Sequence, residues 1–324
     1  MPSNSHSRDR IDPESREPLE QLLQAIPGGF QAIADIEARR AAVRSILAAV
    51  TADIEPNPQV VVSNQNIPGR LDGDQVAVRI YRPKDAIEPT AGLLYIHGGG
   101  MILGDLEGEH LTAEMLCAAL GIALVSTDYR KAPEHSHPAQ VHDCFAALTW
   151  MAEHADDLGI DRSRMGIYGG SAGGNLCLAT AFMSLDQNGP ELKFIMPIYP
   201  MLDASHSTSS NHEFTDIGIW DRSGNIEAWA WFLGGQEPDA YASPKLREDL
   251  SGLPPLYTDV GELDLFRDED LDFVSRLLRA GVPAEFHVFP GVYHTSERVA
   301  PTAALSQRIW QLRLDALRRG LINT

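Results

Sequence analysis

The stretch "MGIYGGSAGGNL", from Met165 to Leu176, places a serine between a short apolar run and an apolar helical pattern. Residues 169–173 have the pattern G-x-S-x-G, with Ser171 at its centre. A sharp strand-to-helix turn of this kind strains the serine backbone and lifts the hydroxyl clear of a sheet, and glycines on both sides avoid collisions. The pattern alone is weak in a glycine-rich chain, so the strand–turn–helix setting is what indicates a nucleophilic serine.

A second apolar run, "AGLLYIHGGG" over residues 91–100, ends in three glycines. Glycine loses the most backbone freedom on folding, so such a run needs a reason. Acyl transfer requires backbone N–H groups beside the negative oxygen of a tetrahedral intermediate, and a side chain there would block the substrate. A loose turn and a phosphate-binding loop are the alternatives, but the stretch lacks both the Lys-Ser/Thr of a P-loop and the spacing G-x-G-x-x-G. We therefore expect an oxyanion hole.

A serine nucleophile needs a histidine base and a carboxylate that orients the base. In an α/β-hydrolase sheet both residues follow the serine, and the acid comes first. His294 lies just past the predicted strand "AEFHVFP", where the carboxyl end of the sheet opens, whereas His287 lies within that strand and is expected to pack. His294 is therefore the candidate base.

The acid is expected at the end of "PLYTDVGELD", which offers Glu262 and Asp264. Asp264 is the first of these residues positioned to leave the strand end, so it is the candidate acid. The acidic residues 268–270 begin a predicted helix, where carboxylates serve as caps and as partners of the helix dipole.

The pattern of the whole chain predicts an α/β protein. From residue 91 onward, short apolar runs alternate with helical patterns, which is typical of a mostly parallel sheet covered on both faces. Before that point, the first 17 residues or so are expected to be mobile, two helical patterns follow, and residues 58–69 and 76–83 are predicted strands. The aromatic-rich segment 204–238 breaks the alternation and is predicted to be an insertion over one end of the sheet.

Composition narrows the possible partners and location of the 324-residue chain. Its net charge of −19, without Lys/Arg clusters, argues against nucleic acid as a partner. We find no apolar stretch long enough to span a membrane and no apolar h-region near the N-terminus, so we expect a cytoplasmic protein. The three cysteines, Cys117, Cys144 and Cys177, form no CxxC pair and are expected to be reduced and buried.

Four motifs in order, "HGGG", "DYRKAPEHSHPA", "GGSAGG" and "GELDLFRDE", followed by the terminal "YH", resemble the hormone-sensitive-lipase-like esterases, the bacterial family IV branch of the α/β hydrolases. The similarity runs from about residue 60 to the C-terminus. It implies an α/β-hydrolase fold, with a mostly parallel eight-stranded sheet, helices on both faces and a helical cap. Residues 1–55 would be N-terminal cap helices, and 56–324 the catalytic domain with the cap insertion at 204–238.

The resemblance also implies a serine carboxylic-ester hydrolase that acts on small to medium acyl esters through an acyl-serine intermediate. No cofactor and no metal is implied, the partner is a small-molecule ester, and a homodimer is a common state of such proteins. The spacings of His135, His137 and His142 fit no zinc template well. The implied site residues are the triad Ser171, Asp264 and His294, the oxyanion donors Gly99, Gly100 and Ala172, and the substrate-binding residues Met101, Phe214 and Trp220.

The chain departs from the family pattern at Gly170, where Asp or Thr is usual before the nucleophile, and at Met101, where an aromatic residue is common. In "DYRKAPEHSHPA" we expect Arg130 and Glu134 to form a structural ion pair.

Two alternatives to ester hydrolysis stay open. The same triad would serve a lactone, carbamate or amide hydrolase, because the leaving group depends on the shape of the pocket. A non-catalytic small-molecule receptor is the other alternative, since the plant hormone receptors of this family keep the pocket and lose the catalytic histidine. The presence of His294 and Asp264 favours an enzyme.

Overall fold

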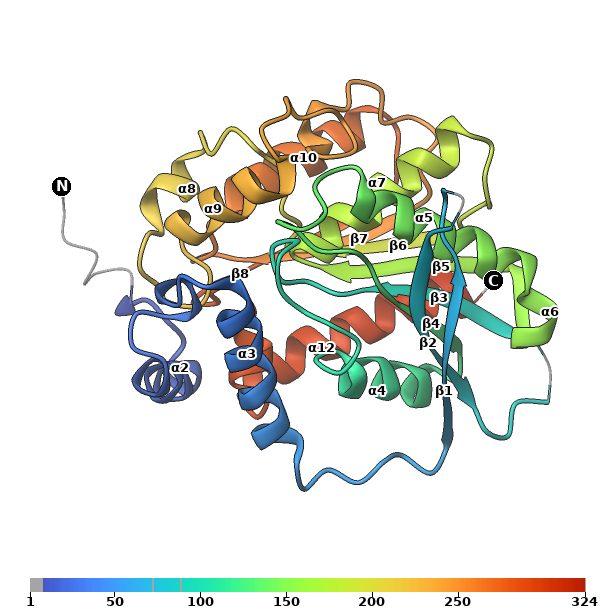
Figure 1. Ribbon diagram of the computed structural model, residues 1–324, viewed down its shortest axis with the longest axis horizontal. Helices are drawn as coiled ribbons and strands as arrows, with labels where there is room; N and C mark the ends of the chain where they lie inside the picture. The colour runs from blue at the N-terminus through green and yellow to red at the C-terminus, as the bar shows by residue number, and fades with distance from the viewer. Residues whose placement is uncertain (1–7, 72, 88, 324) are drawn as a thin grey trace.

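An eight-stranded sheet runs through the computed structural model, which describes residues 8–71, 73–87 and 89–323 (Figure 1). The strands lie in the order β1-β2-β4-β3-β5-β6-β7-β8, and β2 is antiparallel to both its neighbours while β3 to β8 are mutually parallel. The predicted eight-stranded, mostly parallel sheet is confirmed. The strands are β1 (Val60–Pro68), β2 (Gln75–Pro83), β3 (Thr90–Ile96), β4 (Ala123–Asp128), β5 (Ile160–Gly170), β6 (Phe194–Ile198), β7 (Leu256–Gly261) and β8 (Ala284–Phe289).

Helices cover both faces of this sheet, as the continuous apolar strands require (Figure 1). One face carries α5 (Ala139–Glu153), α7 (Ala172–Asp186) and α10 (Arg267–Arg279), and the other carries α4 (His110–Leu120) and α12 (Ala304–Leu317). The sequence analysis did not single out α12, whose buried face includes the charged residue Arg313. Shorter helical segments are η1 (Phe30–Ala32), α6 (Ala155–Leu158), α8 (Ser209–Glu213), η2 (Pro244–Leu246), α11 (Ser296–Val299) and η3 (Arg318–Ile322).

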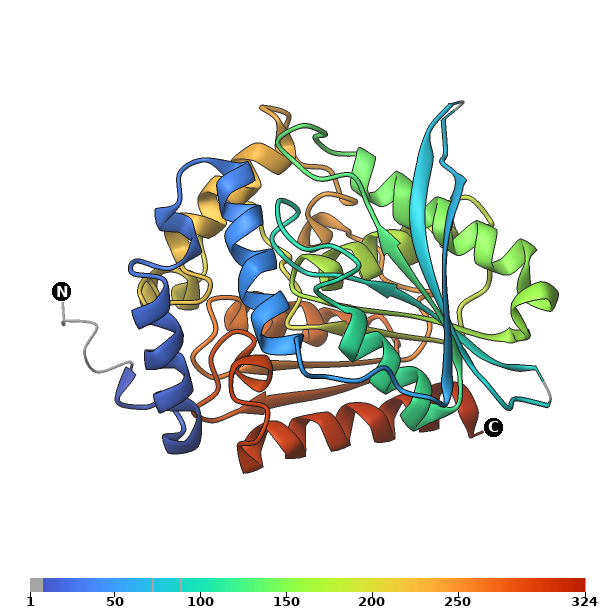
Figure 2. The ribbon, with the colours of Figure 1, turned by 60° about the horizontal axis from the view of Figure 1, so that its bottom comes forward.

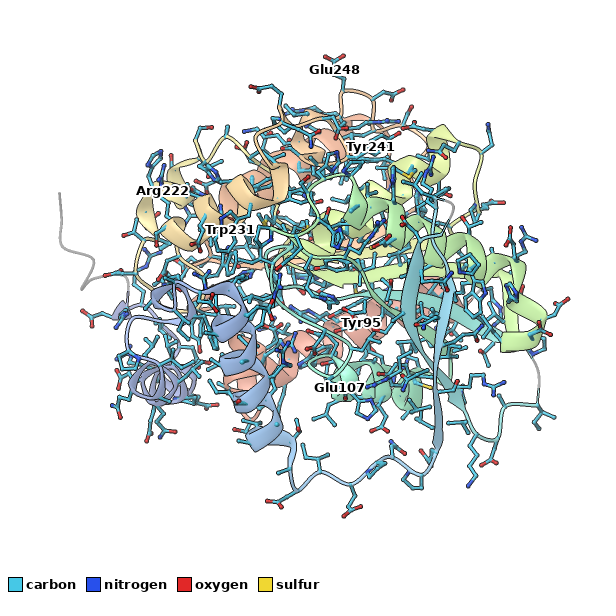
Figure 3. The ribbon with its side chains drawn as sticks, viewed as in Figure 1. Tyr95, Glu107, Arg222, Trp231, Tyr241 and Glu248 are labelled. Atoms are coloured by element: carbon cyan, nitrogen blue, oxygen red, sulfur yellow. The ribbon has the colours of Figure 1, made fainter. Side chains whose placement is uncertain are left out.

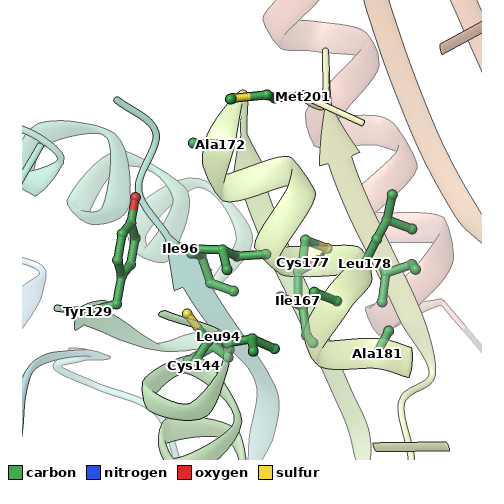
Figure 4. Packing of buried hydrophobic residues seen from close by; sticks show 14 of the residues in the cluster. Leu94, Ile96, Tyr129, Cys144, Ile167, Ala172, Cys177, Leu178, Ala181 and Met201 are labelled. Carbon is green, nitrogen blue, oxygen red and sulfur yellow. Dashed lines mark hydrogen bonds between the residues drawn. The ribbon is translucent and has the colours of Figure 1, made fainter. Parts of the chain in front are cut away.

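The core between the sheet and α5 and α7 is built from strand residues such as Leu94 and Ile167 and from helix residues such as Leu178 (Figure 4). Each of these side chains is fully buried. Cys144 and Cys177 belong to the same core, and Cys117 lies in the core on the other face of the sheet. All three cysteines are buried and free, as predicted.

The N-terminal helices α2 (Pro13–Ala25) and α3 (Ile36–Thr51) lie at one end of the molecule, beside α9 (Arg222–Leu233) from segment 204–238 (Figures 1 and 2). Arg39 of α3 joins the two parts: its guanidinium forms an ion pair with Glu227 at 2.6 Å and lies 5.5 Å from the ring centroid of Trp231, which Figure 3 labels on α9. Two stretches that are far apart in the sequence therefore form one layer.

The expectation of a mobile N-terminus stays a prediction: residues 1–7 lie outside the described residues, and the structure gives residues 8–17 defined contacts that include the start of α2. Asp12 caps α2 by accepting a hydrogen bond from the N–H of Glu14, and Pro13 is the first helical residue. The N–H of Asp12 also donates to the carbonyl of Gly291 at 3.0 Å.

The acidic residues 268–270 lie in the first turn of α10, as predicted, but two of them are not surface caps. Glu269 is buried and accepts hydrogen bonds from the N–H groups of Leu202, at 2.6 Å, and Asp203, at 3.3 Å. Asp270 is 1% exposed, and among the described residues neither of its carboxyl oxygens has a hydrogen-bond partner. Burial, and then the nearby charge of Glu269, raise the pKa of Asp270 well above its ordinary value.

We predict that Asp270→Asn becomes more stable relative to the natural chain as pH rises. The pKa of Asp270 is higher in the folded state than in the unfolded state. Its protonated form therefore contributes fully to stability below the unfolded-state pKa of about 4, and this contribution is lost as pH rises toward the folded-state pKa. The difference in free energy of unfolding between Asp270→Asn and the natural chain should grow by up to about 1.4 kcal/mol per pH unit. Urea unfolding between pH 4 and 8 measures it, with the exposed Asp272→Asn as control. A gap that stays constant with pH would contradict this account.

Candidate active site

Ser171 stands at the turn between β5 and α7, in a strained conformation with φ +60° and ψ −120°. Its N–H donates to the carbonyl of Ile198 at 2.8 Å, which ties the turn to the neighbouring strand. A Cβ added at Gly169 would lie 2.2 Å from the carbonyl oxygen of Gly173, and one added at Gly173 would lie 2.2 Å from that of Ile96. The turn therefore has no room for side chains at these two positions, as the G-x-S-x-G pattern predicts.

A chain of hydrogen bonds connects three residues that are far apart in the sequence. The Oγ of Ser171 lies 3.0 Å from Nε2 of His294, and Nδ1 of His294 lies 2.7 Å from Oδ2 of Asp264. The carboxylate of Asp264 accepts from Nδ1–H, so Nε2 is left as an acceptor for the serine hydroxyl. Asp264 is 1% exposed, and the other two are each 5% exposed. This arrangement can take a proton from the serine hydroxyl.

Aromatic rings hold the imidazole of His294 from two sides. The ring of Tyr199 packs edge-on at a centroid distance of 4.9 Å, and that of Phe266 does so at 5.1 Å. The hydroxyl of Tyr199 donates to Glu297 at 2.7 Å. The N–H of Phe266 also donates to Oδ1 of Asp264 at 3.0 Å, so the base and the acid share a packing neighbour.

Glu262, the other acid that the sequence offered, has a different environment. Its Oε2 accepts a hydrogen bond from the N–H of Gly291 at 3.0 Å, and its Oε1 forms an ion pair with Arg10. The hydrogen bond from Arg10 lowers the pKa of Glu262. Glu262 therefore links the end of β7 to the loop that carries His294. Asp264 is the acid that forms a hydrogen bond with the imidazole.

The glycine loop lies directly against the serine turn. Gly99 and Gly100 have φ values of +107° and +62°, which favour glycine. A Cβ at Gly98 would lie 2.9 Å from the carbonyl oxygen of Gly170. Ala172 is the first residue of α7, and an N–H at that position has no partner within the helix. The predicted oxyanion residues therefore stand on two backbone segments that are in contact beside Ser171.

A cavity with a volume of about 430 Å³ opens onto Ser171 and His294. Helices α2 and α3 and the adjoining Phe30 contribute apolar side chains to its wall: Pro18, Leu22, Phe30, Val43, Ile46, Leu47 and Val50. Polar side chains also line it: Tyr95, Glu109, Thr112, Tyr168, Tyr199, Thr295, Glu297 and Arg298. None of these polar residues belongs to a motif, so the sequence contains no indication that they share one wall.

Of the three predicted substrate-binding residues, only Trp220 lies at this cavity within the described chain. Its indole N–H donates to Oδ1 of Asn225 at 3.2 Å, and its ring covers Gly100, where a Cβ would lie 2.2 Å away. The predicted substrate-binding roles of Met101 and Phe214 do not fit this cavity. Neither side chain lines it, and both are buried in the core. Met101 has φ +65° and is fully buried, and the ring of Phe214 packs under a guanidinium of α10.

The predicted ion pair between Arg130 and Glu134 is wrong. Arg130 pairs with Asp143 at 2.8 Å and with Asp74 at 2.9 Å, and Glu134 pairs with Arg40 of α3 at 2.9 Å. Each partner comes from a different element, so sequence proximity gave no guide to the pairing. His287 lies on β8 and contacts Glu285, in agreement with its expected packing role.

Two further properties concern the described residues as a whole. These residues contain no group of three or more His, Cys, Asp or Glu side chains that could hold a metal ion. No helix among them has both the length and the apolar character needed to cross a membrane.

Comparison with known proteins gives matches over nearly the whole chain. A family model described as alpha/beta hydrolase fold matches residues 93–297. The carboxylesterase NlhH of Mycobacterium tuberculosis is 32% identical over 320 residues, which is 97% of this chain and 98% of that protein. An arylesterase of Saccharolobus solfataricus is 32% identical over 71% of this chain and 78% of its own length.

Solved structures agree with these sequence matches. A solved structure of a bacterial heroin esterase superimposes with a TM-score of 0.90 and 37% identity, over 97% of this chain and 99% of that one. A hyperthermophilic esterase from Pyrobaculum calidifontis gives a TM-score of 0.84 and 32% identity, over 95% and 98% of the two chains.

We predict that Gly170, which precedes Ser171, tolerates an added methyl group better than Gly173, which follows Ala172. At Gly170 a Cβ would lie 3.2 Å from the ring of Tyr199, which would have to shift by only a few tenths of an ångström, so Gly170→Ala should cost about 1 kcal/mol of stability and keep most activity. At Gly173 a Cβ would meet backbone, so Gly173→Ala should cost at least about 3 kcal/mol and abolish turnover. Urea unfolding and kcat/KM for a nitrophenyl ester measure both. Greater damage from Gly170→Ala would show that the turn is packed differently.

Proposed function

The chain belongs to the α/β-hydrolase fold family and is a carboxylesterase-type serine hydrolase, and from that premise we propose that Ser171, His294 and Asp264 are its catalytic triad. The observation that carries this proposal is the unbroken path of hydrogen bonds, 3.0 Å from Ser171 to His294 and 2.7 Å from His294 to Asp264. This path opens into a cavity large enough for a small substrate.

The reaction proceeds as a two-step acyl transfer. His294 takes the proton from the hydroxyl of Ser171 as the oxygen attacks the ester carbonyl, and Asp264 stays ionised and holds the imidazole tautomer. His294 then protonates the leaving alcohol, and an acyl-serine remains. Water repeats the sequence, so that the carboxylic acid leaves and Ser171 is restored.

The negative oxygen of each tetrahedral intermediate is held by the N–H groups of Gly99, Gly100 and Ala172. Their placement on two touching backbone segments supports this role, because the donors are positioned before the substrate arrives. His97 supports the loop: its ring is buried and stacks on Tyr129 at 4.1 Å, and the Tyr129 hydroxyl donates to its carbonyl at 3.0 Å.

The triad geometry also bears on the alternatives. A receptor that only binds its ligand has no need of a serine, an imidazole and a carboxylate in hydrogen-bonding order, so the geometry favours turnover. Lactones, carbamates and amides would use the same atoms. The names of the relatives, which include a carboxylesterase and an arylesterase, favour esters as the substrate class.

The layer formed by α2, α3 and segment 204–238 acts as a cap that limits acyl-chain length. The apolar side chains of α2 and α3 in the cavity wall, together with Trp220, support this role. Their burial by a hydrocarbon chain would contribute about 0.8 kcal/mol per methylene, which gives the cavity a preference for chains that fill it.

A cytoplasmic location is supported by the three free cysteines, which suit a reducing compartment. A small-molecule ester is the partner that the cavity fits. The homodimer stays a prediction.

We predict that Ser171→Ala and Asp264→Asn each lower kcat for a short nitrophenyl ester by about 10³-fold or more. The control is Glu262→Gln, which retains an acceptor for the N–H of Gly291 and should stay within about tenfold of the natural chain. Steady-state rates with a folded-state check by circular dichroism measure this. A larger loss from Glu262→Gln than from Asp264→Asn would exchange the roles of the two acids.

We predict that Ile46→Trp narrows the cavity and selects shorter chains. The ratio of kcat/KM for an octanoate to that for an acetate should fall at least about tenfold, because the added ring occupies space next to the acyl chain. Ser45→Trp is the matched control, since Ser45 is the preceding residue of α3 and is exposed. An equal fall in both variants, or in neither, would remove α3 from the chain-length argument.

A further inference from the structure

The cavity wall contains an ion pair that the triad mechanism does not use. Nη1 of Arg298 lies 2.7 Å from Oε1 of Glu109, and Nη2 donates to the carbonyl of Gly108 at 3.1 Å. The other carboxylate oxygen of Glu109 accepts from the hydroxyl of Tyr95 at 2.5 Å. Arg298, Glu109 and Tyr95 all line the same cavity as Ser171 and His294.

The guanidinium of Arg298 has donors to spare. It carries five N–H groups, and two of its nitrogens have one acceptor each among the described residues. Its side chain is 35% exposed, whereas that of Glu109 is 8% exposed. A substrate in the cavity can therefore contact unused N–H donors of Arg298, whose positive charge is already balanced by Glu109.

These donors are held in place before a substrate binds. Arg298 belongs to α11, which begins two residues after His294, and its carboxylate partner Glu109 is fixed in turn by Tyr95. The ring of Tyr95 stacks on that of Tyr168 at 5.1 Å, and Figure 3 labels Tyr95 in the middle of the molecule, where β3 ends. Because the arginine is already oriented, binding to it costs little side-chain entropy.

The chemistry of the wall discriminates between possible substrate groups. A hydrocarbon chain there would strip water from the unused N–H donors and leave them unpaired, which is unfavourable. A carboxylate would find the charge of Arg298 already balanced by Glu109, and a second carboxylate, Glu297, also lines the cavity. An ammonium group would face the guanidinium itself. A neutral oxygen accepts the hydrogen bond without adding a charge.

We propose that Arg298, held by Glu109, is a specificity-determining residue that donates a hydrogen bond to a neutral oxygen of the substrate other than those of the scissile ester. The preferred esters then carry a second oxygen function, such as an ether, a carbonyl or a hydroxyl group, in the acyl or the alcohol part. This inference rests on the proposed function, because it concerns the substrate of the same serine site.

The test compares esters with their oxa-analogues, in which one methylene is replaced by an ether oxygen. One series consists of nitrophenyl esters of straight four- to eight-carbon acids with the oxygen at successive positions, and a second consists of acetates of straight alcohols treated in the same way. For each pair, the kcat/KM ratio of oxa-analogue to hydrocarbon is measured for the natural chain and for Arg298→Met. Dividing the two ratios cancels the intrinsic reactivity of the esters.

The double ratio should reach about tenfold where the oxygen meets Arg298 and stay near one at other positions. Arg308→Met is the matched control, since Arg308 is exposed on α12, and it should leave every ratio as in the natural chain. Because Arg298→Met leaves Glu109 without its cation, the double variant Glu109→Gln/Arg298→Met is measured as well and should show the same loss of preference. If neither variant folds, the natural chain still provides a test. Its kcat/KM ratio of oxa-analogue to hydrocarbon ester, divided by the same ratio of rates for hydroxide-catalysed hydrolysis, should be highest at the position where the oxygen contacts Arg298.

Double ratios near one at every position of both series would overturn the proposal. A preference of the natural chain for carboxylate-bearing analogues, lost in Arg298→Met, would also overturn it and indicate an anion site. In either case, turnover that still depends on Ser171 would leave the ester-hydrolase proposal intact. Turnover that no longer depends on Ser171 would contradict the ester-hydrolase proposal itself, and the rate of Ser171→Ala detects that outcome separately.

Discussion

The close contact between the serine turn and the glycine loop is the constraint on which the site depends. Gly173 approaches the carbonyls of Ile96 and His97 at the end of β3, and Gly98 approaches the carbonyl of Gly170, at distances that leave no room for a Cβ. Bare backbone at these positions brings two segments together that are more than 70 residues apart along the chain. The same contact holds Ser171 at φ +60° and sets the N–H groups of both segments beside it. The positions of the proposed nucleophile and of the proposed oxyanion donors are thus consequences of one packing requirement.

The histidine and the acid reach this point because β7 and β8 end next to each other, beyond β6. Beneath His294 lies a buried network in which Arg313 pairs with Asp259 and Glu297, all with side chains at most 2% exposed. Glu297 also accepts from Tyr199, whose ring packs on the imidazole. Removing one partner from such a network costs about 3–5 kcal/mol, because a charge is left buried without compensation. The orientation of the base is therefore supported by α12, although that helix contributes no atom to the triad.

The cavity combines two kinds of wall. Helices α2 and α3 supply apolar surface, and the loop after His294 and the start of α4 supply the ion pair of Arg298 and Glu109. The apolar part favours burial of a hydrocarbon chain, and the ion pair disfavours it unless an oxygen is present. In the roles that we propose, different elements set the chain length and the polarity of the substrate, so each can vary without disturbing the proposed triad.

The sequence by itself determined the sheet class, and it also pointed to the glycine loop and to the serine, acid and histidine that we propose as the triad. These features depend on local backbone geometry or on strand–helix alternation, and both leave a pattern along the chain. Only the tertiary structure decided that Met101 and Phe214 point into the core, that Arg130 pairs with Asp143, and that Arg298 and Glu109 meet in the cavity wall. Such pairings join side chains from elements far apart in the sequence, and their partners are chosen by packing, which no spacing of residues records.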